Sequence, residues 1–178
     1  MPSHPYVEQL GAIIGTPGTS AEPIDWAAVE SAIGLRLPSD YRELHDRYQP
    51  YAFAEEFCWM PPPVTPPDWS QEYSLAAEAE QYLDDARGLR AQSPETCPYP
   101  LFPEPGGIYP WAYSAGNDVF WWRTAGALDE WPTIVQARDQ GEDDWWEYAC
   151  SASELLFKLL TGQIRCPVFP HLYEDPAP

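Results

Sequence analysis

The chain has 178 residues and a formal net charge of -19 at pH 7, from 28 acidic against 9 basic residues. Hydrophobic residues make up 44% and aromatic residues 15% of it, which excludes a disordered chain and predicts a globular domain with its own core. Because the acidic residues are spread along the whole chain, we expect a negative surface field that disfavours nucleic acid and anionic membranes as partners.

Two short amphipathic helices are expected in the first part of the chain. The first covers residues 26–34, with Asp25 as a candidate N-cap and Gly34 placed to end the helix. The second covers residues 38–48, where Pro38 suits a first helical turn. The following stretch to residue 69 contains PPPVTPP and predicts a loop with one strand near residues 57–60.

A mid-chain helix is predicted for residues 70–92, which are rich in helix formers and carry an apolar stripe. After a Pro-Gly loop that runs through Gly107, the period changes. Four short runs of aromatic and β-branched residues, separated by turn residues, predict an antiparallel meander; they are residues 108–114, 118–124, 132–137 and 145–149.

A C-terminal helix is predicted for residues 151–162, where Ser151 and Glu154 have capping-box spacing and Gly162 marks the end. Helices first, then a sheet, then a last helix predict an α+β domain.

No catalytic or metal-binding pattern is found. The three histidines have no spacing that joins them to a nucleophile and an orienting acid: His4, His45 and His171. The four cysteines have no ligand spacing, and reduced thiols are expected, with a Cys150–Cys166 bridge as the alternative: Cys58, Cys97, Cys150 and Cys166. We therefore expect no enzyme activity, no metal and no cofactor.

The location of the protein follows from its apolar segments. Residues 1–15 lack the basic start and the apolar length of a signal peptide, and no apolar run approaches the ~20 residues of a membrane helix. We expect a soluble, cytoplasmic protein.

Five motifs in order carry a family resemblance: W-x-x-V-E-x-x-x-G-L-x-L-P-x-D-Y at 26–41, GNDVFWWRT at 116–124, WPTIV at 131–135, a Trp-rich strand at 145–148, and S-x-S-E-L-L-x-x-L-L-x-G at 151–162. Together they resemble the Smi/Knr branch of the SUKH superfamily, over about residues 22–170. The resemblance implies an α+β fold with helices packed on an antiparallel sheet. It carries over no catalytic residue.

The resemblance also implies two functions. Bacterial members of this family are regarded as immunity proteins that bind and neutralise toxins, often nucleases, whereas fungal members are scaffolds in cell-wall control. We expect one SUKH-like domain over residues 1–178, in which the N-terminal segment and the proline-rich C-terminal tail are peripheral. Its expected partner is a protein, a basic toxin domain; the alternative is a scaffold role for a self protein. The acidity alone also fits simple solubility.

The predicted contact surface combines acidic residues with tryptophans, the composition of an interface hot spot. Alternation places Trp121 and Trp122 on opposite faces of their strand. The resemblance implies that Trp122 lies in the core, and because Trp121 shares its face with Arg123 we expect Trp121 to be partly exposed. For the acidic residues and Trp145, the alternative is a solvated turn beside a core tryptophan. The predicted partner-binding residues are Trp121, Asp129, Glu130, Glu142, Asp143, Asp144 and Trp145.

Overall fold

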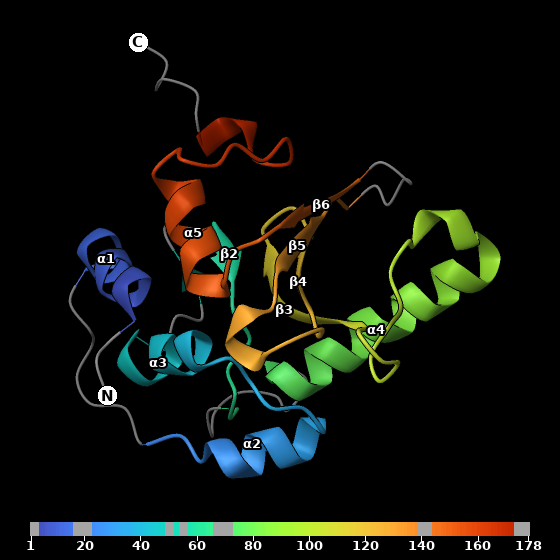
Figure 1. Cartoon of the computed structure of the whole chain (residues 1–178), viewed down its shortest axis with the longest axis horizontal. Coiled ribbons are helices and arrows are strands. Elements are labelled where there is room, and N and C mark those ends of the chain that lie inside the picture. Colours follow the sequence, from blue (N-terminus) through green and yellow to red (C-terminus); the bar gives the residue numbers. More distant parts are fainter. Residues whose placement is uncertain are drawn as a thin grey trace.

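The computed structural model describes residues 4–15, 23–48, 52–53, 57–65, 73–138 and 144–172. In these residues, helices cover both faces of an antiparallel sheet (Figure 1), which confirms the predicted α+β class. The α-helices are α1 (Pro5–Ile14), α2 (Trp26–Ile33), α3 (Ser39–Tyr48), α4 (Leu75–Gln92) and α5 (Ala152–Leu160). The strands are β1 (Ala52–Phe53), β2 (Cys58–Trp59), β3 (Ile108–Ser114), β4 (Val119–Arg123), β5 (Thr133–Gln136) and β6 (Trp145–Tyr148).

The sheet is a simple meander. Its strands lie in chain order, β1-β2-β3-β4-β5-β6, and each described pair is antiparallel. The register places Trp121 of β4 opposite Ile134 of β5, and Trp122 opposite Thr133. The four strands predicted after Gly107 are therefore confirmed, with a register shift between Pro110 and Ala112 in β3.

The helix ends follow the predicted capping residues. Asp25 accepts a hydrogen bond from the amide of Ala28, and Gly34 ends α2 in the left-handed conformation at φ 71°. Ser151 caps α5 in the same way, and Ser74, which was not predicted as a cap, caps α4. Two starts lie later than predicted, since α3 begins at Ser39 and α4 at Leu75.

One face of the sheet packs against α3 and the segment after α5. The Tyr41 ring of α3 meets Trp122 edge-on with 4.8 Å between centroids, and Phe120 stacks on Phe169 at 5.6 Å. Phe120 and Trp122 are fully buried. The prediction that Trp122 belongs to the core is confirmed.

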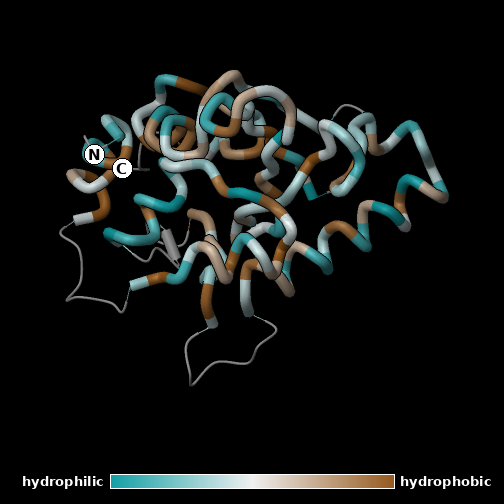
Figure 2. Tube along the Cα trace, turned by 60° about the horizontal axis from the view of Figure 1, so that its bottom comes forward, coloured by the Kyte–Doolittle hydropathy of each residue, from teal (hydrophilic) through white to brown (hydrophobic). Residues whose placement is uncertain are grey.

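The opposite face of the sheet is covered by α4. Tyr82 of α4 contacts Tyr113 of β3 with 5.7 Å between ring centroids, and the sheet-facing residues Leu75, Ala79 and Leu83 are buried. Figure 2 shows hydrophilic and hydrophobic residues alternating along this helix, which extends to the right of the molecule. A helix with one apolar stripe needs such a partner surface.

The N-terminal segment is not peripheral, contrary to expectation. Residues 5–14 form α1, whose Val7 and Leu10 are fully buried and which packs against α3 and α5. The sequence carries the signal, because Val7 and Leu10 are three residues apart on one helix face. The expectation for the C-terminal tail falls on residues 173–178, outside the described residues.

Candidate functional site

The predicted acidic residues at the β4–β5 connection lie in a short 3-10 helix, η3 (Leu128–Glu130). Glu130 is exposed, and so is Asp129, yet the Asp129 carboxylate has a structural partner. Its Oδ1 accepts a hydrogen bond of 2.7 Å from the backbone amide of Ser39, the first residue of α3. Asp129 therefore satisfies an amide that α3 leaves free at its N-terminus.

This contact changes the acidity of Asp129. Partial burial raises its pKa, but the hydrogen bonds from Ser39 and the nearby charges of His4 and Arg42 act in the opposite direction and lower the pKa overall. Asp129 is thus held as a carboxylate by its own fold.

The second predicted group lies at the β5–β6 hairpin. Glu142 and Asp143 fall outside the described residues. Asp144 and Trp145 are half-buried; the indole N–H of Trp145 donates to the carbonyl of Thr96 at 3.0 Å, and its ring contacts Tyr99. These contacts give Trp145 the structural role that was the alternative interpretation.

The two predicted groups do not form one surface. Asp129 and Glu130 precede β5, whereas Trp145 pairs with Gln136 at the other end of that strand. They are separated by the length of β5, so a single small partner loop does not contact both.

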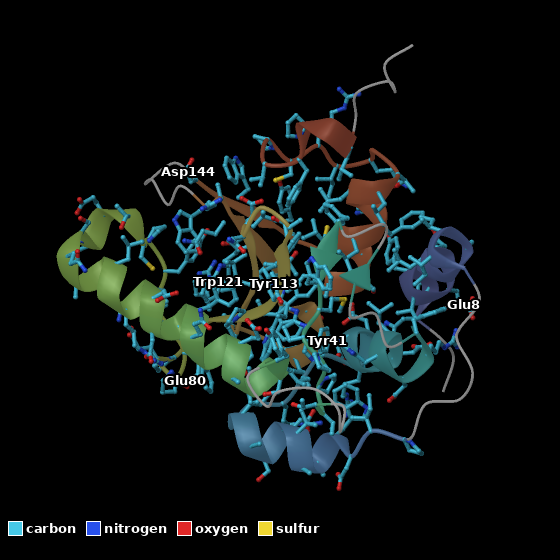
Figure 3. All side chains as sticks on the ribbon, turned by 180° about the vertical axis from the view of Figure 1, so that it is seen from behind. Glu8, Tyr41, Glu80, Tyr113, Trp121 and Asp144 are labelled. Atoms are coloured by element: carbon cyan, nitrogen blue, oxygen red, sulfur yellow. The ribbon has the colours of Figure 1, made fainter. Side chains whose placement is uncertain are left out.

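The prediction that Trp121 is partly exposed is wrong. Its side chain is only 1% exposed. Alternation along β4 does place the Trp121 and Trp122 side chains on opposite faces of the sheet, but α4 covers the face that carries Trp121. In Figure 3 Trp121 lies beside α4, whereas Tyr41 lies toward α3. A sheet with helices on both faces buries both sets of alternating side chains.

A polar cleft of about 240 Å³ opens between α4 and this face of the sheet. Its helical wall is formed by Gln81, Tyr82, Asp85 and Ala86, and its sheet wall by Asn117, Val119, Trp121, Gln136 and Arg138. Sequence reasoning missed this set, apart from Trp121. Spacing alone indicates that Gln81 shares a face with Asp85 and that Gln136 shares one with Arg138. No local signal indicates that these two faces meet.

The cleft holds an oriented amide. The indole N–H of Trp121 donates to Oε1 of Gln136 at 3.0 Å. Because an indole N–H only donates, this bond fixes which end of the amide is oxygen and leaves Nε2 as the other end. Gln136 is only 3% exposed, and Nε2 donates to no atom of the described residues.

A histidine and a serine from distant parts of the chain also meet. His4 Nε2 lies 2.8 Å from Ser39 Oγ, and the amide of His4 donates to Glu43. A histidine beside a hydroxyl is the first requirement of a nucleophile–base pair. Acyl transfer also needs free donors for a developing oxyanion, but the Ser39 amide is bound to the Asp129 carboxylate, whose charge opposes an oxyanion. The arrangement suits a link between α1, α3 and η3.

His45 lies deep in the core against Tyr41, with 4.5 Å between ring centroids. Burial lowers its pKa to about 3, so the ring is neutral at physiological pH. Neither ring nitrogen has a hydrogen-bond partner in the described structure. Four neighbouring aromatic side chains of this core also bury a polar atom without a partner: Tyr41, Trp111, Trp122 and Trp131.

The four cysteines are buried free thiols, so the alternative Cys150–Cys166 bridge is not formed. Among the described residues, no group of three or more His, Cys, Asp or Glu side chains is arranged to hold a metal ion. In the same residues, no helix is both long and apolar enough to span a membrane. In comparisons with known proteins, the chain matches no family model, no curated protein and no solved structure.

Proposed function

We propose that this chain is a non-enzymatic protein-binding domain that neutralises a basic toxin, as expected of an immunity protein of the SUKH type. The proposal rests mainly on charge. Six of the nine basic residues are paired with carboxylates of the same chain, namely Arg42, Arg47, Arg87, Arg90, Arg123 and Lys158. The charged side chains that are not used in these ion pairs, and that can therefore contact a partner, are predominantly acidic.

A net charge of -19 attracts a basic protein surface over long range. Complementary fields raise association rates by about 10- to 1,000-fold at low salt, and this gain falls as ions screen the charges. A toxin that binds nucleic acid needs a basic surface of its own, so it fits this field. An acidic binder then blocks the surface that the toxin uses for its substrate.

We propose two contact regions, one at η3 and one at the β5–β6 hairpin. Glu130 at η3 is exposed and forms no ion pair among the described residues. Asp144 and Trp145 at the β5–β6 hairpin form a second region at the other end of β5. Trp121 is left out of both because the side chain is buried.

Co-expression with the product of the adjacent open reading frame tests the proposal. We expect that product to arrest growth alone, that the chain restores growth, and that the two form a complex that weakens as salt is raised. Glu130→Lys should weaken the complex, whereas Glu8→Lys on the outer side of α1 serves as a charge-matched control. A neighbouring product that neither harms cells nor binds contradicts the immunity role and favours the scaffold role.

A further inference from the structure

We propose that the cleft between α4 and the sheet binds a small zwitterion, an α-amino acid, with its carboxylate at Gln136 and Arg138 and its ammonium at Asp85. The proposal does not rest on the protein-binding role. It starts from the Gln136 amide in the wall of the cleft, whose Oε1 is engaged by Trp121 and whose Nε2 donates to no described atom. An amide N–H₂ on the wall of a cleft is a donor that a bound ligand can engage.

Arg138 extends the donor set. It lies two residues beyond Gln136, the last residue of β5, and both residues line the cleft. Arg138 is exposed, and its guanidinium forms no ion pair within the part of the chain that the structure describes. A guanidinium beside an amide N–H₂ is a donor pair that matches a carboxylate.

Asp85 sets the charge on the opposite wall. It lies one helical turn after Gln81 on α4, is exposed, and also lines the cleft. A simple anion would meet this carboxylate and the field of a chain with net charge -19. A simple cation would meet Arg138. A ligand that carries both charges avoids both penalties.

The size and the floor of the cleft agree with this class. The volume of about 240 Å³ lies below the range of about 300–1,000 Å³ of sites for drug-sized ligands, so the ligand is small. Val119, Ala86 and the Trp121 indole contribute apolar surface to the lining of the cleft. An aliphatic or aromatic side chain of the amino acid packs there.

Titration of the full chain with each of the twenty amino acids tests the site, by calorimetry and by the NMR signal of the Trp121 indole N–H. That N–H is bonded to the amide of the cleft, so its chemical shift reports occupancy. We expect at least one amino acid to bind, and acetate and ethylamine, which each carry one charge, to fail. Arg138→Gln and Asp85→Asn should each weaken binding by about tenfold or more, because each removes one charged contact.

Arg36→Gln and Glu8→Gln are matched controls, since both residues are exposed, form no ion pair among the described residues and lie outside the cleft. They should leave the affinity unchanged. Three results would overturn the proposal. They are the absence of binding of every amino acid at concentrations up to about 10 mM, which is tenfold above a dissociation constant of about 1 mM, binding of acetate with the same affinity as an amino acid, and an unchanged affinity in Arg138→Gln. Loss of amino-acid binding in Arg138→Gln with normal capture of a protein partner would separate this site from the proposed function.

Discussion

The buried carboxylate of Asp40 in α3 accepts two hydrogen bonds from Ser153 in α5. The backbone amide of Ser153 donates at 2.9 Å and its hydroxyl at 2.8 Å, both to the same Oδ2 atom. Asp40 is 2% exposed and lies at the N-terminal turn of α5, where the helix dipole favours a negative charge. One side chain thus joins α3 to α5 through two residues that are 113 positions apart in the chain.

Replacing this carboxylate should destabilise the fold. In Asp40→Asn, one carboxylate oxygen is replaced by an N–H₂ group that cannot accept a hydrogen bond from Ser153. The negative charge at the N-terminus of α5 is also lost. We expect the free energy of unfolding to fall by about 1–3 kcal/mol. Urea unfolding followed by circular dichroism measures this, and Glu8→Gln at an exposed position of α1 should change it by less than about 0.5 kcal/mol. Equal effects of the two substitutions would contradict the role of the Asp40–Ser153 contact.

His45 should make stability depend on pH. In the folded chain burial lowers its pKa to about 3, whereas an unfolded histidine has a pKa near 6.5. Between about pH 6.5 and pH 3, His45 is protonated in the unfolded state but neutral in the folded state. The contribution is therefore full above about pH 6.5 and is lost as pH falls, by about 1.4 kcal/mol per pH unit.

The substitution His45→Leu, of similar volume, removes this titration. Between pH 6.5 and pH 4.5, we expect the free energy of unfolding of this variant to fall less steeply with decreasing pH than that of the unmodified chain. The difference in slope should be about 1.4 kcal/mol per pH unit. At pH 7.5 the variant should be at least as stable, because it removes two buried ring nitrogens that have no partner. Parallel profiles in chemical unfolding would contradict this assignment.

Helix α1 should contribute to the stability of the whole fold. Leu10 is fully buried, whereas Ile13 on the same helix is 45% exposed. We expect Leu10→Ala to lower the free energy of unfolding by about 2–5 kcal/mol, since it leaves a cavity in the core. Ile13→Ala is the matched control and should cost less than about 1 kcal/mol. A small loss in Leu10→Ala, measured by thermal and urea unfolding, would return α1 to the peripheral role expected from the sequence.

Trp145 should stabilise the fold through its indole N–H. Trp145→Phe keeps an aromatic ring beside Tyr99 but leaves the carbonyl of Thr96 without its donor. We expect a loss of about 1 kcal/mol in urea unfolding. Trp146→Phe at the next position of β6 is the control, because its indole forms no hydrogen bond with the described residues. A Trp145→Phe protein of unchanged stability that loses its protein partner would instead support the interface role.

Local patterns determined the elements of this fold. Asp25 with Gly34, Ser74 and Ser151 mark helix ends by hydrogen bonds within a few residues, so they are visible in the sequence. The same holds for the alternation that separates Trp121 from Trp122, because neighbouring side chains of a strand always point to opposite faces. These features depend on short spacings, and the α+β class follows from their order.

Only the tertiary structure decided which surfaces meet. The sequence contains the apolar stripe of α4 and the alternation of β4, but their pairing depends on contacts between distant segments, and it buries Trp121 and creates the cleft with Gln136 and Arg138. Asp129 and Asp40 read locally as ordinary acids, yet each satisfies an amide near the N-terminus of a distant helix. The reason is physical: a cap or a strand period is settled by neighbours in the chain, whereas the burial of a side chain is settled by whatever packs against it.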